Sequence, residues 1–177
     1  LYTARRTGVG DTVLIGATCN DTANFLRAED GFNFYGISLD ACLVQWDISC
    51  PSPGICFSAA NGQSIYHTTD NGVNWTRLQT GWGYYHGIDC VDENTCWVAG
   101  EHGQIRYTHN AGLTWERQQP NIPDSVVFWR LRMLDRRHGY AIGEKGVIYR
   151  TNDGRTWRQL PAFTTEKLLD LHIDRKS

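Results

Sequence analysis

The stretch "TTDNGVNW" at residues 68–75 decides the fold, because the chain repeats it. "THNAGLTW" follows at 108–115, "TNDGRTW" follows at 151–157, and "AEDGFNF" at 28–34 is a weaker fourth copy. Each copy ends in an aromatic residue, and these aromatic residues recur at steps of 40 to 42 residues. A fixed period of this length is the sequence signature of a repeat architecture.

Short apolar segments surround each copy in the same order. In the third repeat, "YHGIDC" (85–90) and "CWVAG" (96–100) precede the strand-like "QIRYT" (104–108), which runs into the repeated phrase. This order predicts four short strands per repeat, separated by polar turns. Units of four antiparallel strands with this period are the blades of a β-propeller. We therefore predict an all-β fold, a small β-propeller of about four four-stranded blades in a single domain spanning 1–177.

The predicted blades cover residues 11–39, 40–80, 81–120 and 121–162. The first repeat has no recognisable first strand, whereas "KLLDLHID" (167–174) resembles a first strand with nothing after it. We therefore expect the C-terminal strand to complete the N-terminal blade, which would close the ring and remove open sheet edges that promote aggregation. A larger ring, completed by a second chain or by further sequence, is the alternative.

The repeated phrase resembles the Asp-box, or BNR repeat, of sialidases, sortilin-type receptors, xyloglucanase-like glycosidases and photosystem II stability/assembly factors. The repeats at 96–118 and 143–161 look most like the assembly-factor type. This resemblance implies a structural turn between the third and fourth strands of a blade, on the face away from the usual binding site. Asp70 and Asp153 would accept backbone hydrogen bonds, the glycines would take positive φ, and the tryptophans would pack between blades. These positions are Asp70, Gly72, Trp75, Asn110, Gly112, Trp115, Asp153, Gly154 and Trp157.

The six cysteines favour a disulfide framework. Cys50 and Cys56 flank a short turn, as do Cys90 and Cys96, and this spacing suits a bridge across a hairpin. Cys19 and Cys42 remain as a third pair; free buried thiols are the alternative. Metal ligands would more often lie two to four residues apart in repeated clusters. We therefore expect an oxidising, extracytoplasmic location, whether secreted, periplasmic or lumenal.

Charge and composition restrict the partners. The net charge of −2 and the isoelectric point near 6.3 argue against nucleic acid, which selects a strongly basic face. No stretch approaches the roughly 18 apolar residues of a membrane helix, so we expect no membrane insertion. We predict no cofactor and no metal site, although a metal held by His86 and His102 on neighbouring blades remains an alternative.

The sequence does not favour an enzyme. A sialidase would require an arginine triad and an "RIP"-like segment near the start, and the chain has no such segment. A glycosidase of another type needs two facing carboxylates, for which Asp47, Asp89, Glu101 and Glu144 are the candidates. Asp47 and Asp89 occupy like positions in their repeats, as do Glu101 and Glu144, and equivalent positions usually have equivalent structural roles. We therefore predict no catalytic residue.

A binding surface is the stronger hypothesis. The first strand of each blade and the loop before it define one face of a propeller, and aromatic residues with arginine are enriched at binding hot spots. The segment "GWGYYHG" (81–87) is the most suggestive stretch, although Tyr85 and Trp129 could instead fill the centre of the ring. The predicted binding residues are Trp46, Trp82, Tyr84, Tyr85, His86, Trp129 and Arg130.

These observations predict a non-catalytic binding or assembly module that uses one propeller face to hold a protein partner, and a homodimer is possible. The alternative is a carbohydrate-binding or glycoside-hydrolase-related propeller. In that case Trp82, Tyr84 and Tyr85 would act as stacking platforms for a glycan.

Overall fold

The computed structural model describes residues 3–16, 24–30, 33–39, 43–118 and 121–173. Within these residues the chain forms four four-stranded antiparallel sheets and one 3-10 turn, η1 (Glu144–Gly146). The first sheet contains β1 (Thr3–Arg6), β2 (Val13–Gly16), β3 (Phe25–Ala28) and β4 (Tyr35–Ile37). The second contains β5 (Gln45–Ser52), β6 (Ile55–Ala60), β7 (Ser64–Thr68) and β8 (Thr76–Gln79). The third contains β9 (Tyr85–Cys90), β10 (Cys96–Gly100), β11 (Ile105–Thr108) and β12 (Glu116–Gln118). The fourth contains β13 (Phe128–Met133), β14 (Gly139–Gly143), β15 (Ile148–Thr151) and β16 (Trp157–Gln159).

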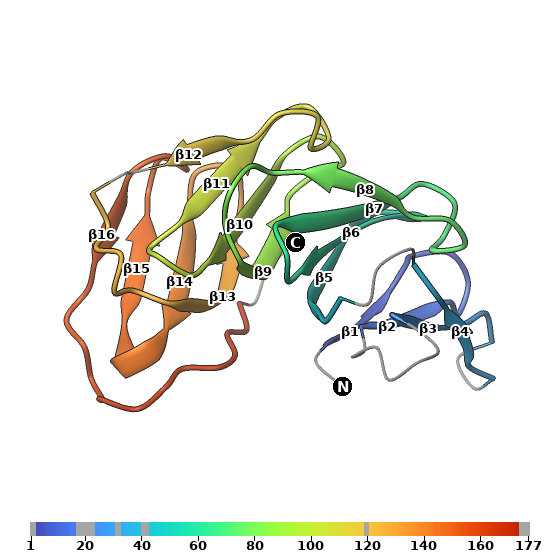
Figure 1. Cartoon of the computed structure of the whole chain (residues 1–177), viewed down its shortest axis with the longest axis horizontal. Helices are drawn as coiled ribbons and strands as arrows, with labels where there is room; N and C mark the ends of the chain where they lie inside the picture. The colour runs from blue at the N-terminus through green and yellow to red at the C-terminus, as the bar shows by residue number, and fades with distance from the viewer. Residues whose placement is uncertain (1–2, 17–23, 31–32, 40–42, 119–120, 174–177) are drawn as a thin grey trace.

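Each sheet is a simple meander, in which every strand pairs with its neighbour in the sequence. The sheets follow one another in chain order (Figure 1). This arrangement confirms the all-β prediction and the four blades of a small β-propeller. Among the described residues, no helix has the length and apolar character needed to cross a membrane.

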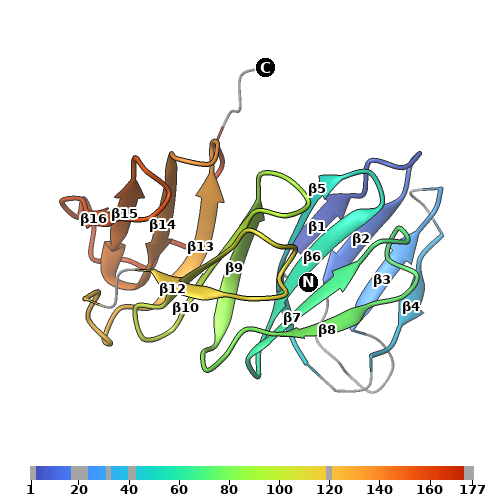
Figure 2. The same cartoon turned by 90° about the horizontal axis from the view of Figure 1, so that it is seen from above.

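The first strands of neighbouring sheets pack against one another: β1 contacts β5, β5 contacts β9, and β9 contacts β13. Figure 2 shows β9 between β13 on one side and the second sheet on the other. Gly87 allows the close approach of β9 and β13, because a Cβ atom there would lie 2.7 Å from the backbone nitrogen of Leu131. These four strands, which we call the inner strands, therefore surround the centre of the molecule.

The expected C-terminal clasp is wrong. The first strand of the N-terminal blade is β1, which pairs with β2 from Thr3 opposite Gly16 to Arg6 opposite Val13. Residues 167–173, the described part of the expected strand, contain no strand. A hairpin between adjacent segments is the shorter connection, and it leaves β2 with no free edge for a distant segment. β1 was not predicted because "TARR" carries little apolar character.

The sheets consequently form an arc. Among the described residues, the packing that joins β1 to β5, β5 to β9 and β9 to β13 has no counterpart of that extent between β13 and β1. Figure 1 shows the first and fourth sheets at opposite ends of this arc, with the C-terminal segment returning towards its centre.

The hydrophobic core lies between neighbouring sheets. Strands β9 and β10 are buried over their whole length, because the third sheet is covered on both faces. The largest cluster joins the third and fourth sheets, the next joins the second and third, and the smallest joins the first and second. Their largest members are Trp97, Phe128 and Trp157 in the first cluster, Phe57 and Tyr85 in the second, and Leu14, Phe25 and Ile48 in the third.

The repeated phrase forms a closed turn. In the second sheet, Thr68 Oγ1 donates to Asp70 Oδ1 at 2.8 Å and accepts from Gly72 N at 3.0 Å. Asn74 N donates to the same aspartate oxygen at 2.9 Å, and Gly72 adopts φ of 82°, a left-handed conformation that glycine takes at little cost. The side chains of Thr68 and Asp70 are thus engaged within the turn, as in an architectural element.

The copies at 108–115 and 151–157 repeat these bonds. Asn110 Oδ1 accepts from Thr108 Oγ1 at 2.9 Å and from Thr114 N at 3.0 Å, so an amide oxygen takes the place of the carboxylate. Asp153 Oδ1 accepts from Thr151 Oγ1 at 3.1 Å and from Thr156 N at 2.7 Å. Gly112 and Gly154 again have positive φ.

The closing aromatic residues pack towards the preceding sheet. The ring of Trp75 stacks on Phe25 of the first sheet with centroids 4.2 Å apart. Trp115 packs against the cluster between the second and third sheets. Trp157 is fully buried and donates to Gln118 Oε1 at 2.9 Å. These contacts lock each sheet onto the one before it.

Two disulfides close the turns between inner and second strands. Cys50 bonds to Cys56 and Cys90 bonds to Cys96, the pairings that the spacing predicted. The expected third pair, Cys19 and Cys42, lies outside the described residues.

Candidate functional site

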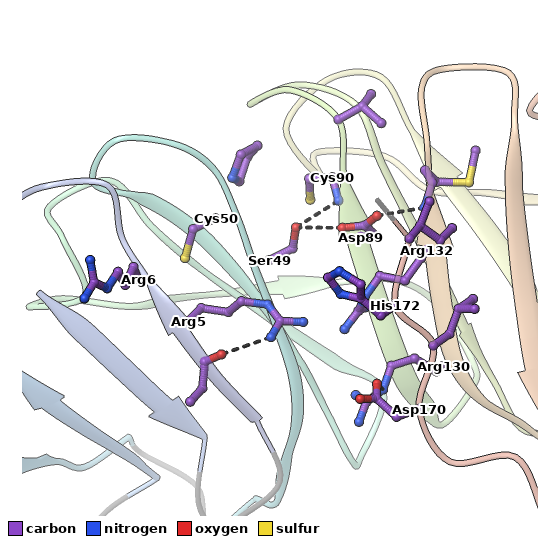
Figure 3. A pocket seen from close by; sticks show the side chains of 16 residues that line it. Arg5, Arg6, Ser49, Cys50, Asp89, Cys90, Arg130, Arg132, Asp170 and His172 are labelled. Carbon is purple, nitrogen blue, oxygen red and sulfur yellow. Dashed lines mark hydrogen bonds and ion pairs between the residues drawn. The ribbon is translucent and has the colours of Figure 1, made fainter. Parts of the chain in front are cut away.

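A cavity of about 600 Å³ lies at the centre of the arc, lined by all four inner strands and by residues 170–173. Its charged lining residues are Arg5, Arg6, Arg130, Arg132, Asp89 and Asp170, together with His172. Figure 3 shows Arg5 on the side of β1, Arg130 and Arg132 on the side of β13, and His172 between them in this view. We call this cavity the arginine pocket. Four arginines against two aspartates make it a positively charged cavity.

A buried carboxylate organises these arginines. Asp47, on β5, has no exposed surface, and its oxygens lie 2.7 Å from Arg132 Nη1, 3.2 Å from Arg130 Nη1 and 3.7 Å from Arg5 Nη2. Burial by itself would raise the pKa of Asp47, but the three guanidinium groups outweigh it and hold this pKa below its usual value. Burial likewise opposes the charge of Arg132, yet Asp47 raises the pKa of Arg132 above its usual value. Asp47 therefore stays negatively charged and Arg132 stays positively charged, and their ion pair holds the guanidinium group in place.

Asp47 and Asp89 have equivalent structural roles. Asp47 Oδ2 accepts from Ile88 N at 3.3 Å, and Asp89 Oδ2 accepts from Met133 N at 2.7 Å. Each carboxylate thus ties its inner strand to the inner strand of the next sheet. Ser49 Oγ also donates to Asp89 at 3.3 Å. Both carboxylates are thus engaged by neighbouring groups of the protein.

Three aromatic rings meet beside the pocket. Trp46, His86 and Trp129 are each the second residue of an inner strand, so the propeller brings them together. His86 stacks on Trp129 with centroids 4.3 Å apart, and Trp46 meets both rings edge-on at 5.0 and 5.7 Å. We call these three residues the aromatic cluster. Burial lowers the pKa of His86, only partly offset by its contacts with Phe128 O and Glu101, so its ring is neutral near pH 7.

The two glutamates at equivalent turns support this cluster. Glu144 Oε1 accepts from Trp129 Nε1 at 2.8 Å, and Glu101 Oε1 lies 3.8 Å from His86 Nε2. Both turns join the second and third strands of their sheets. Each glutamate therefore contacts the ring on the inner strand of its own sheet.

The structure brings together four of the seven predicted binding residues. Arg130 Nη1 donates to Trp46 O at 3.4 Å, which joins the aromatic cluster to the arginine pocket. Tyr85 is instead fully buried, and its hydroxyl contacts Gln104 Oε1 at 3.3 Å. Tyr85 is therefore a core residue, and its ring is not accessible to a partner. The prediction that Tyr85 belongs to the binding surface is wrong.

Trp82 and Tyr84 lie in the loop before β9 and are 58% and 40% exposed. Trp82 contacts His102, with ring centroids 5.2 Å apart, and His102 Nε2 lies 4.0 Å from Glu101 Oε2. Glu101 therefore stands between His86 and His102, so these histidines do not form an isolated pair. The described part of the chain contains no group of three or more His, Cys, Asp or Glu side chains placed to hold a metal ion.

The predicted binding residues did not include Arg5, Arg6, Arg132 or Asp170, which line the cavity. One signal for Arg132 was available: residues two apart in a strand face the same side, so "RLR" at 130–132 places both arginines on one face. No local pattern shows that Arg5 comes from the opposite end of the arc, because that contact depends on the packing of the sheets.

Comparisons with known proteins agree with the fold. No family model matches the chain. The photosystem II assembly lipoprotein Ycf48 of Nostoc sp. (strain PCC 7120 / SAG 25.82 / UTEX 2576) is 25% identical over 118 residues, which cover 62% of this chain. The matched region spans about a third of that relative, 34% of its length.

Solved structures give the same picture. A structure of YCF48 bound to D1 peptide aligns with a TM-score of 0.56 at 12% identity, covering 89% of this chain and 79% of that one. An ancestral GH74 enzyme aligns with a TM-score of 0.73 at 11% identity, covering 91% of this chain and 24% of that one. Likenesses at such low identity show the fold alone. The chain is thus a β-propeller with a distant sequence similarity to the photosystem II assembly factor Ycf48.

Proposed function

We propose that this chain is a non-catalytic, extracytoplasmic binding module that holds a protein partner at the centre of the arc. The observation that carries the proposal is the arginine pocket, where side chains from the first and last sheets line one cavity. The partner supplies an extended segment with carboxylate groups, which enters the pocket beside the aromatic cluster.

The chemistry of the pocket fits such a segment. Guanidinium groups form strong charge-assisted hydrogen bonds with carboxylates. Asp47 holds Arg130 and Arg132 in place before any ligand arrives, so less side-chain entropy is lost on binding. Arg6 is exposed at the edge of the same cavity and is available to an incoming anion. The exposed rings of Trp82 and Tyr84 would supply apolar contacts of the kind found at hot spots.

The comparisons support a protein partner. The relative from Nostoc is named an assembly lipoprotein, and the similar solved structure of YCF48 is bound to a peptide. The two disulfides suit an oxidising compartment, which supports an extracytoplasmic location. On this proposal the repeated turns are Asp-boxes that act as architecture only.

Glycan binding is the second candidate, favoured by the exposed ring of Trp82. Stacking on such a ring is a common way to hold a sugar. Hydrolysis is not part of this candidate, because Asp47 and Asp89 are both committed to contacts within the protein.

Fluorescence anisotropy with labelled ten-residue peptides tests the proposal. We expect a peptide rich in Asp and Glu to bind, and a matched peptide rich in Lys not to bind. Arg6→Gln should weaken binding about tenfold, the effect of losing one charge-assisted hydrogen bond. Arg117→Gln is the matched control, because Arg117 is exposed on the outer strand β12 and should leave binding unchanged.

Two results would contradict the proposal: equal binding of the acidic and basic peptides, or equal losses in the two arginine variants. Binding of a neutral oligosaccharide in place of the acidic peptide, abolished by Trp82→Ala, would favour the second candidate.

A further inference from the structure

We propose that residues 164–173 form a displaceable strap, which places Asp170 in the arginine pocket as an internal competitor for the carboxylate of the partner. This inference rests on the proposed function, because it concerns the regulation of the same pocket. It assigns a role to a segment that the propeller does not use as a strand.

The strap follows a path from the periphery to the centre. The chain leaves β16 at the outer edge of the fourth sheet and returns along that sheet to the inner strands (Figure 1). Residues 170–173 then line the cavity, together with all four inner strands. A segment with no strand pairing of its own thus ends in the candidate binding site.

The strap has a first attachment at the fourth sheet. Leu168 N donates to Gly143 O at 3.0 Å. Lys167 Nζ lies 2.8 Å from Glu144 Oε1 and 4.6 Å from the ring centroid of Trp129, so it contacts both members of that hydrogen-bonded pair. These contacts hold the strap beside the aromatic cluster and outside the pocket.

The second attachment is the ion pair of Asp170 with Arg130. Asp170 Oδ1 lies 3.2 Å from Arg130 Nε, while Arg130 Nη1 lies 3.2 Å from Asp47 Oδ1. Figure 3 shows Asp170 and Arg130 side by side at the edge of the pocket. Arg130 therefore faces two carboxylates of very different character. Asp47 is fully buried, whereas the side chain of Asp170 is 77% exposed.

The strap is weakly held compared with the sheets. None of the residues 161–173, all of which the structure describes, is buried, and the side chain of Leu169 is 58% exposed. The pair of Lys167 with Glu144 joins two partly exposed groups and contributes little to stability, and segments with few buried contacts open at low cost. A carboxylate from a partner can therefore replace Asp170 at Arg130 without disturbing the pair with Asp47.

Competition of this kind lowers the apparent affinity of the pocket. With Asp170 in place, one arginine of the pocket is already paired with an exposed anion. When the strap leaves, Arg5, Arg6, Arg130 and Arg132 face Asp89 alone among the acidic lining residues. The partner binds only the open state, so its apparent affinity falls in proportion to the fraction of molecules in that state.

Asp170→Asn tests the strap with the labelled acidic peptide described above. The amide keeps the shape of the side chain and removes the competing charge, while the contacts of Lys167 and Leu168 remain. We expect the peptide to bind roughly fivefold more tightly, as the closed state loses its advantage. Asp124→Asn is the matched control: it makes the same charge change in an exposed loop residue outside the pocket, and should leave affinity unchanged.

Hydrogen exchange at the Leu168 amide gives a second readout in the unmodified protein. Saturating peptide should accelerate exchange at this amide, because displacement of the strap breaks its bond to Gly143 O. Unchanged or slower exchange at saturation would overturn the displacement of the strap.

The outcomes separate the strap from the function. One outcome overturns the strap and leaves the proposed function standing. In that outcome Arg6→Gln weakens peptide binding, whereas Asp170→Asn leaves it unchanged or weakens it. If Asp170→Asn and Asp124→Asn increase peptide affinity equally, the strap is also overturned, because the increase then comes from the change in net charge alone. If the peptide binds neither the unmodified protein nor Asp170→Asn, both proposals are overturned.

Discussion

Arg132 reaches from the inner strand of the fourth sheet to Asp47 on the inner strand of the second, where its Nη1 lies 2.7 Å from a carboxylate with no exposed surface. The guanidinium passes the third sheet on the way, and its Nη1 also donates to Ile88 O of β9 at 3.3 Å. One buried ion pair thus links three consecutive sheets. The same carboxylate also contacts Arg130 and Arg5 of the pocket, so Asp47 contributes both to the stability of the fold and to the candidate site.

Asp47→Asn should destabilise the protein strongly. The amide leaves three guanidinium groups without their common carboxylate, and removing one partner of a buried ion pair costs about 3–5 kcal/mol. Urea unfolding of the variant and of the unmodified protein measures this loss. With Asp124→Asn as the control, a loss of less than about 1 kcal/mol in Asp47→Asn would contradict a central role for the pair.

The turn at Asp153 should accept asparagine and reject alanine. Asn110 already shows that an amide oxygen can receive the same bonds from threonine hydroxyl and backbone groups. Asp153→Ala removes this acceptor and should cost about 1–2 kcal/mol, whereas Asp153→Asn should cost less than half as much. Thermal unfolding of both variants provides the comparison. Equal losses would show that the negative charge, and not the acceptor, stabilises the turn.

The stability of this turn should depend on pH. Hydrogen bonds from Thr156 and Arg155 hold the pKa of Asp153 well below its usual value. A carboxyl whose pKa is depressed by folding stabilises the protein above the pKa of the unfolded chain, about 3.9, and this contribution is lost as pH falls towards the lower folded value. We therefore expect unfolding free energy to decline more steeply below pH 4 in the unmodified protein than in Asp153→Asn. Parallel declines of the two proteins would refute the assignment.

Each hairpin disulfide should add a similar, modest stability. Both bridges span six positions of sequence, so they restrict the unfolded chain to the same extent. Loop-closure entropy for such a short loop corresponds to about 2 kcal/mol. The double variants Cys50→Ser/Cys56→Ser and Cys90→Ser/Cys96→Ser, compared by urea unfolding, test this value. A much larger loss in the second pair would indicate packing of the buried Cys90 and Cys96, and not entropy, as the main contribution.

Local features of the fold could be predicted from the sequence, and non-local ones could not. The turns and both hairpin bridges depend on residues a few positions apart, so their patterns are visible in the chain itself. The first strand was not predicted because "TARR" has only one small apolar residue, whereas 167–173 resembled a strand because it has several large ones. Apolar character does not make a strand where the expected edge is already paired, as the edge of β2 is by β1.

Part of the candidate site could likewise be predicted from the sequence, and part could not. The sequence placed Trp46, His86, Trp129 and Arg130 on inner strands, because equivalent positions of a repeat occupy equivalent positions of the propeller. It could not distinguish Tyr85, which points into the core, from its neighbour Tyr84, which is exposed, since alternation in a strand does not say which face is covered.

The sequence by itself determined the repeat, the four-stranded sheets, the closed turns and the two hairpin disulfides, because each is specified by contacts within one repeat. The tertiary structure alone decided the convergence of Arg5, Arg130 and Arg132 on Asp47, and the return of Asp170 to Arg130. These contacts join residues 40 or more positions apart, and their geometry follows from how one sheet packs on the next. The positive charge at the centre of the arc is therefore a property of the assembled sheets, whereas the net charge of the whole chain is −2.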